Sequence, residues 1–172
     1  QALNYYNKSL DIRLKLFGED HPDVAVAFNN IGSVYYSRHQ YEKALEFHQK
    51  AIKIRTRVFG PECHFVGVSC GHLGAIYEGL KQYKLALKYY SQSLKINRKN
   101  FGEENEAVAN MYQYMGDVHA KLMNDHLARK MYLKALTIYS KLQSNREEII
   151  VPIQEAIKYI EENSSCMKDP II

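Results

Sequence analysis

The sequence repeats with a period of 42 residues over most of its length. The residues that obey this period are the Phe-Gly pairs 17–18, 59–60 and 101–102, the glycines Gly32, Gly74 and Gly116, the alanines Ala44, Ala86 and Ala128, and the isoleucines Ile54, Ile96 and Ile138. A fixed period of tens of residues indicates supersecondary units that stack on one another. Each unit then packs mainly against its neighbours, so the chain is not expected to form one globular core.

Each unit has the pattern of two helices joined by a short turn. Gly18 should end one helix, because glycine accepts the left-handed conformation of a helix C-terminus. Asp20 or His21 should cap the next helix, whose first turn accommodates Pro22. The apolar spacing predicts paired helices over 22–37 and 41–58, 62–80 and 83–100, and 105–123 and 125–141. Helices joined by so short a link form an antiparallel hairpin.

The two ends of the chain depart from this plan. Residues 2–16 align with 44–58, so we expect the second helix of a repeat whose first helix is missing, as in a segment of a larger protein. After residue 141 the repeat stops. Residues 144–147 have the spacing of a capping box, and the isoleucine stripe that follows predicts a helix covering the last repeat. Pro152 should kink this helix or mark its start.

The predicted organisation follows from these boundaries. It consists of half a repeat over 1–16, full repeats over 17–58, 59–100 and 101–143, a capping helix over 144–163 and a loose tail over 164–172.

The repeats share an ordered set of small and large residues. These residues are Phe28, Ile31, Gly32, Tyr35, Ala44, His48 and Ala51, then Cys70, Leu73, Gly74, Tyr77, Ala86, Tyr90 and Ser93, and then Tyr112, Met115, Gly116, His119, Ala128, Tyr132 and Ala135. This pattern resembles the tetratricopeptide repeat, with three units in phase. The unit length and the Phe-Gly joints resemble the 42-residue subclass found in kinesin light chains. The resemblance implies an all-α fold, a right-handed superhelical solenoid of antiparallel helix pairs with a C-terminal capping helix.

The glycines inside the helices need an explanation. Glycine in a helix interior costs about 1 kcal/mol relative to alanine. Three such glycines in phase predict a close approach of the second helix of each repeat, with the small residues Ala44, Ala86 and Ala128 as their partners. Tyr35 and Tyr77 should fill the space beside them.

The resemblance also implies a concave groove that binds a short linear peptide. By analogy with the family, the groove would be lined by Val26, Asn29, Asn30, Ser33, Val68, His72, Ala75, Asn110, Gln113, Tyr114, Asp117 and Lys121. Amide side chains can both donate to and accept from a peptide backbone. The alternative is that these are ordinary solvated residues. The set lacks the lysine and asparagine arrangement with which some tetratricopeptide modules clamp a C-terminal carboxylate.

Several other functions are not supported by the composition. The net charge is only +4 with both signs interspersed, whereas nucleic-acid binders concentrate basic residues. No apolar run approaches the ~18 residues of a membrane span, and no signal peptide is evident. No histidine has a nucleophile at a recognisable spacing, and no phosphate-binding loop occurs. We therefore expect no enzymatic activity, no cofactor, no nucleic-acid partner and no membrane insertion.

The three cysteines do not form a disulfide framework, which favours a reducing, cytoplasmic compartment. Cys63 and Cys70 with His72 could suggest zinc. Cys70, however, occupies the core position shared with Phe28 and Tyr112. We therefore expect a buried apolar cysteine and no metal site.

The leading interpretation is a protein–protein interaction adaptor, similar to kinesin-light-chain cargo adaptors, that binds a peptide in the groove. The alternative is a structural module of a larger protein, used for self-association, for contact with another domain or for autoinhibition. An exposed apolar face on residues 2–16 would favour this alternative.

Overall fold

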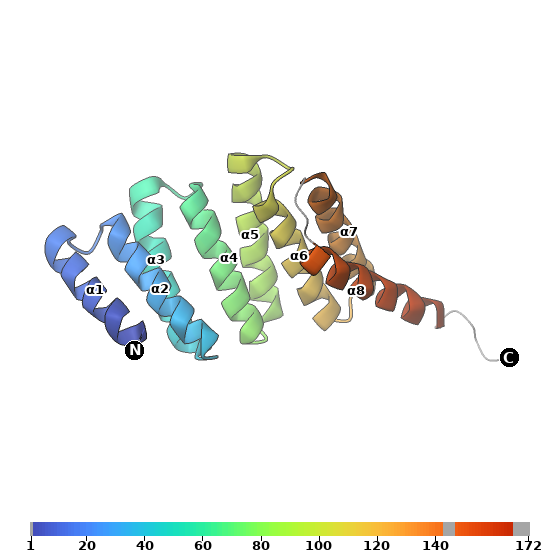
Figure 1. The fold of residues 1–172 in the computed structure, drawn as a ribbon, viewed down its shortest axis with the longest axis horizontal. Coiled ribbons are helices and arrows are strands. Elements are labelled where there is room, and N and C mark those ends of the chain that lie inside the picture. Colours follow the sequence, from blue (N-terminus) through green and yellow to red (C-terminus); the bar gives the residue numbers. More distant parts are fainter. Residues whose placement is uncertain (1, 143–146, 167–172) are drawn as a thin grey trace. The chain divides into compact units, whose positions relative to one another are not determined.

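The computed structural model describes residues 2–142 and 147–166, and its regular elements are all α-helices (Figure 1). They are α1 (Ala2–Phe17), α2 (Pro22–Ser37), α3 (Tyr41–Phe59), α4 (His64–Gly79), α5 (Tyr83–Phe101), α6 (Glu106–Lys121), α7 (Asp125–Lys141) and α8 (Glu147–Cys166). The prediction of an all-α repeat array is confirmed.

The chain forms two compact units, Gln1–Asn100 and Phe101–Ile172. In the first unit α2 packs against α1 and α3, and α3 also packs against α4. The hydroxyl of Ser93 on α5 donates to the carbonyl of Gly67 on α4 at 2.8 Å, which joins the next helix to the stack. In the second unit α7 packs against both α6 and α8. Within each unit, the helices therefore pack against neighbours in the sequence.

The helix ends follow the local chemistry of the sequence. Gly18, Gly60 and Gly102 have φ angles of 77°, 84° and 81°, as expected for helix-ending glycines. Of the two candidate caps for α2, His21 is the one used, since its Nδ1 accepts from the backbone N–H of Asp23 at 3.2 Å. Two helices begin later than predicted. The predicted starts were residues 62 and 105, whereas α4 begins at His64 and α6 at Glu106.

These later starts have a common cause, because the side chain of the preceding residue acts as the cap in both helices. The Sγ of Cys63 accepts from the N–H of Phe65 at 3.4 Å, and the Oδ1 of Asn105 accepts from the N–H of Ala107 at 2.8 Å. Each helix therefore begins one residue after its cap.

The three glycines inside helices make room for rings. The expected close approach of the second helix is confirmed, but the atoms nearest each glycine belong to the ring four residues after the expected alanine partner at 44, 86 or 128. Side chains on a helix lean back towards its N-terminus, which allows a residue one turn later to reach this position. A Cβ on Gly32 would lie 2.6 Å from the ring of His48, one on Gly74 2.5 Å from Tyr90, and one on Gly116 2.6 Å from Tyr132.

The first unit contains two buried clusters. One joins α1, α2 and α3 through Leu10, Val24, Ala25, Ala27, Ile31, Ala51 and Ile54. The other joins α4 and α5 through Val66, Cys70 and Ile96. Cys70 is fully buried, as predicted, and this burial raises the pKa of its thiol to about 11.

One ion pair recurs in every repeat. A basic residue near the end of the second helix of each repeat binds an acid 37 residues earlier. That acid lies in the loop before the first helix of the same repeat. The pairs are Arg57 with Asp20, Lys99 with Glu62, and Lys141 with Glu104. Lys99 holds the pKa of the Glu62 carboxyl below its usual value. All six side chains are exposed, so these ion pairs contribute little to stability. Their main effect is to align the second helix with the loop that carries the acid.

The last helix covers α7 as predicted. Ile153, Ile157 and Ile160 are buried, and the guanidinium of Arg129 on α7 binds the carboxylate of Glu161 at 2.7 Å. Pro152 lies inside α8 and therefore does not mark its start. The helix also runs three residues beyond its expected end at residue 163. Residues 144–146 of the expected capping box, and 167–172 of the expected tail, lie outside the described residues.

Among the helices within residues 2–142 and 147–166, none combines the length and the apolar character that crossing a membrane requires.

Candidate functional site

In the first unit, the residues predicted to line a groove lie on one face of α2 and one face of α4. The helices bury their packing residues, such as Val24 and Ile31 on α2. The residues between these packing positions are left accessible to different degrees. Val26, Ser33 and Val68 are exposed, whereas Asn29, Asn30, His72 and Ala75 are half-buried.

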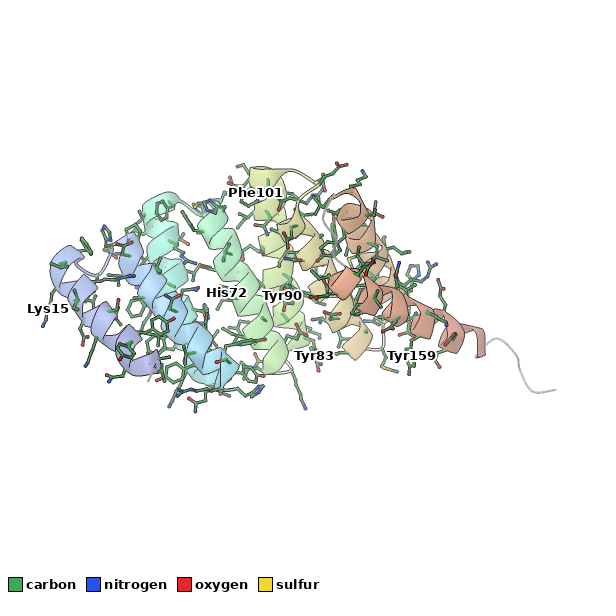
Figure 2. All side chains as sticks on the ribbon, viewed as in Figure 1. Lys15, His72, Tyr83, Tyr90, Phe101 and Tyr159 are labelled. Atoms are coloured by element: carbon green, nitrogen blue, oxygen red, sulfur yellow. The ribbon has the colours of Figure 1, made fainter. Side chains whose placement is uncertain are left out.

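A hydrogen bond joins the two faces. Nδ1 of His72 on α4 lies 3.0 Å from Oδ1 of Asn29 on α2 (His72 is labelled in Figure 2). A carbonyl oxygen can only accept, so Nδ1 of His72 carries the proton in this bond. The structure therefore brings together two predicted site residues that are 43 positions apart in the sequence.

A small cavity of about 50 Å³ lies beside this bond. It is lined by Ser33, Tyr36, His48, His72, Ala75 and Ile76. Three of these residues were predicted for the groove. His48 and Tyr36 were not, because the repeat pattern placed His48 among the packing residues. The change from tyrosine at positions 90 and 132 to histidine at position 48 is the sequence signal that could have identified it.

His48 is a buried and neutral imidazole. It is 2% exposed, and its ring centre lies 4.9 Å from that of His72. Burial, followed by the charges of His72 and Arg55, lowers the pKa of His48 to about 3. The pKa of His72 is also lowered, first by burial and then by Arg55. Nδ1 of His48 is buried without a hydrogen-bond partner in the described part of the chain.

Arg55 is a buried cation close to these two histidines. It is 7% exposed, and its Nη1 donates to Oγ of Ser69 at 2.7 Å and to the carbonyl of Phe65 at 3.4 Å. Its guanidinium also lies 6.0 Å from the ring centre of Phe65. No carboxylate among the described residues pairs with it, and burial lowers its pKa. The charge of Arg55 is therefore held by a hydroxyl and a carbonyl rather than by an acid.

The predicted groove residues of the second unit are differently engaged. The hydroxyl of Tyr139 on α7 donates to Oδ1 of Asn110 at 2.5 Å and also lies 3.0 Å from Oε1 of Gln113. The hydroxyl of Tyr132 donates to the carboxylate of Asp117 at 2.8 Å. Tyr114 and Lys121 are exposed. The two amide groups that the sequence offered to a peptide here are therefore already in contact with a hydroxyl of α7.

Two larger cavities are lined by none of the residues that were predicted for the groove. One of about 350 Å³ in the first unit is lined by Leu14, Glu19, Asp20, Phe28, Lys50, Lys53, Ile54 and Arg57. One of about 780 Å³ in the second unit lies between the α6–α7 turn and α8. Within residues 2–142 and 147–166, no three histidine, cysteine or acidic side chains gather in a way that could hold a metal ion.

Solved structures share this architecture. BtubC (BKLC) from P. vanneervenii superimposes with a TM-score of 0.83 at 22% identity, over 93% of this chain and 64% of that chain. TPR-like repeats assigned to a kinesin light chain from Podosopora anserina give 0.76 at 14% identity, over 95% and 77%. The first TPR of Spaghetti (RPAP3), bound to an HSP90 peptide, gives 0.62 at 16% identity, over 84% and 96%.

The present chain thus spans less than two thirds of BtubC. None of the curated proteins compared with the chain matches it. The sequence itself matches the model of the tetratricopeptide repeat over residues 1–61 and 67–141. That match, the helix pairs and the structural neighbours agree, and the chain belongs to the tetratricopeptide repeat family.

Proposed function

We propose that the chain is a non-enzymatic adaptor that binds a short extended peptide of a partner protein. The peptide would lie along the accessible faces of α2 and α4 in the first unit. The observation that carries this proposal is the hydrogen bond between Asn29 and His72, which aligns polar groups of successive repeats beside a cavity. A role like that of kinesin-light-chain adaptors, and a cytoplasmic location, are part of the same proposal.

The chemistry of these faces suits an extended peptide. Such a peptide leaves its backbone N–H and C=O groups unpaired, and the half-buried amides of Asn29 and Asn30 can serve either group. The exposed Val26 and Val68 provide apolar contact for alternate side chains. A related tetratricopeptide module, that of Spaghetti (RPAP3), is solved with an HSP90 peptide, which supports this use of the fold.

A displayed library of random peptides tests the proposal. We expect the chain to enrich a common short motif, and the double substitution Asn30→Ala with His72→Ala to weaken binding of the enriched peptides at least tenfold. Lys84→Ala with Lys88→Ala on the exposed face of α5 is the matched control and should leave binding unchanged. Unchanged affinity in the double variant Asn30→Ala with His72→Ala would show that the peptide binds elsewhere.

Self-association is the second candidate function, and one observation favours it. The side chains of Tyr5, Ile12 and Leu16 on α1 are 73%, 57% and 68% exposed, which is unusual for large apolar residues on a single helix. Either a second copy of the chain or another protein domain could cover them. Light scattering at increasing concentration would detect a dimer, and Ile12→Asp should abolish it.

A further inference from the structure

The positive charge of the chain lies mainly in its first compact unit. Residues 1–100 contain 15 lysines and arginines and 8 acids, whereas residues 101–172 contain 8 and 11. Within the first unit, α5 carries five basic residues and no acid. These residues are Lys84, Lys88, Lys95, Arg98 and Lys99, and all five are exposed. The modest net charge of +4 therefore includes one strongly basic helix.

Four of these residues, Lys84, Lys88, Lys95 and Lys99, share one side of α5. At 3.6 residues per turn they lie within about 60° of one another around the helix, and at 1.5 Å per residue they span about 23 Å along it. We call these four residues the lysine stripe. The helix that carries it is the one on which Tyr83 and Phe101 are labelled in Figure 2. The stripe is therefore a continuous positive surface along α5.

The first repeat does not have this stripe, because acids stand at two of the equivalent positions. Glu42 and Glu46 on α3 correspond to Lys84 and Lys88 on α5. Glu46 also binds Lys50 on its own helix at 2.6 Å, whereas the position equivalent to Lys50 in the second repeat is a glutamine. The same repeat architecture thus forms with acids at these positions. The lysines at 84 and 88 are not a requirement of its packing.

The stripe has a cost within the chain. Like charges four residues apart on a helix repel each other, as at positions 84 and 88 and at 95 and 99. Glu62 compensates one end, because it binds Lys99 and its carboxyl pKa is lowered by Lys99 and then by Lys95. At the other end, no acid among the described residues forms an ion pair with Lys84 or Lys88. Repulsion that packing does not require favours a role for the stripe in binding a partner.

The side chains around the stripe favour a protein over other anions. Surfaces that bind single-stranded nucleic acid stack its bases on accessible aromatic rings. The tyrosines of α5, Tyr83, Tyr89 and Tyr90, are half-buried or buried. A helix that lies on a membrane inserts an apolar face. The exposed large apolar side chains of α5 are Leu85 and Phe101, at its two ends, so the middle of the stripe offers only charge.

We propose that the lysine stripe of α5 binds an acidic segment of a partner protein, rich in aspartate and glutamate. An extended segment of about seven residues, at about 3.3 Å per residue, matches the length of the stripe. This surface is distinct from the faces of α2 and α4 to which the peptide groove is assigned. It therefore gives the chain a second contact whose recognition is electrostatic, and such contacts weaken as salt is added.

A fluorescently labelled peptide of seven glutamates is the probe, and its anisotropy measures binding to the whole chain. We expect Lys88→Glu with Lys95→Glu to weaken binding about tenfold, because the stripe then has no net charge. The variant should unfold at the same temperature as the wild type or at a higher one. Each new glutamate lies four residues from a remaining lysine, which replaces repulsion by attraction.

Two controls separate the stripe from other causes. Lys8→Glu with Lys130→Glu makes the same change in net charge at exposed positions on α1 and α7, and should leave binding within about twofold of the wild type. Asn30→Ala with His72→Ala alters the groove and should leave binding of the glutamate peptide unchanged. The proposed groove and the lysine stripe are thereby tested independently.

Three results with this probe would overturn the proposal. Equal weakening by both charge variants would show that only the net charge of the chain matters. Weakening by the groove variant, without weakening by the α5 variant, would place acid recognition on α2 and α4. Tighter stripe-dependent binding of an oligothymidine, or of phosphatidylserine vesicles, would show that the partner is a nucleic acid or a membrane and not an acidic protein segment.

A second copy of the chain is the remaining occupant to distinguish, because α8 is rich in acids. Its exposed glutamates are Glu147, Glu148, Glu155, Glu161 and Glu162. Light scattering at increasing concentration tests this occupant. We expect no association that Lys88→Glu with Lys95→Glu abolishes. A dimer that this variant abolishes would show that the stripe serves self-association, and would overturn the assignment to another protein.

Discussion

Nδ1 of His72 donates to Oδ1 of Asn29 at 3.0 Å, and this bond joins the first helices of two successive repeats. The bond determines which tautomer His72 adopts. With its proton held at Nδ1, the neutral ring presents Nε2 only as an acceptor. His72 can donate from Nε2 to a ligand carboxylate only when it takes up a second proton.

His48 should make the chain less stable in acid. Its pKa is about 3 in the folded state, below the ordinary value of 6.5, so the unfolded chain binds more protons between these two values. The unfolding free energy is therefore unaffected by this group above about pH 6.5. It falls as the pH drops towards 3, by at most about 1.4 kcal/mol per pH unit.

Urea unfolding of the wild-type chain and of His48→Tyr, at several pH values between about 7 and 4, tests this prediction. The difference in unfolding free energy between the two proteins should grow in favour of the variant as the pH falls. His126→Tyr controls for the loss of an exposed imidazole. A constant difference between wild type and variant would contradict the assignment.

Gly74→Ala should destabilise the first unit, although alanine is the better helix former. The added Cβ would lie 2.5 Å from the ring of Tyr90, which is 1% exposed and bound to Glu78. The ring has little room to move, so we expect a loss of about 1–3 kcal/mol, as in overpacked cores. The gain in helix propensity, about 1 kcal/mol, works against this loss.

Thermal and urea unfolding of a double-mutant cycle with Tyr90→Leu measure the contact. The smaller side chain should restore part of the stability lost in Gly74→Ala. If Gly74→Ala alone stabilises the chain, the ring does not require a glycine beneath it.

Ile157→Ala should destabilise the second unit by about 2–4 kcal/mol, because it removes a buried side chain from the contact between α8 and α7. Gln154→Ala, at an exposed position on the same helix, is the matched control. Urea unfolding of both variants measures the difference. Equal effects would mean that the isoleucine stripe of α8 does not stabilise the unit.

Much of the fold could be predicted from the sequence, because helix ends and packing stripes depend on local chemistry. The positive φ angles of Gly18, Gly60 and Gly102 and the burial of Cys70 follow from a pattern seen three times. The partners of the mid-helix glycines could not be predicted, because direction along a helix decides which side chain reaches them. Likewise, capping by Cys63 depends on a side-chain contact that the spacing does not reveal.

The sequence by itself determined the repeat and its helix pairs. The tertiary structure alone decided that Asn29 and His72 meet, that Asn110 and Gln113 are bound by Tyr139, and that a cavity lies beside His48. The physical reason is that periodicity is a property of each helix by itself. A hydrogen bond or a cavity depends on how far a particular side chain extends between helices, and histidine is shorter than tyrosine.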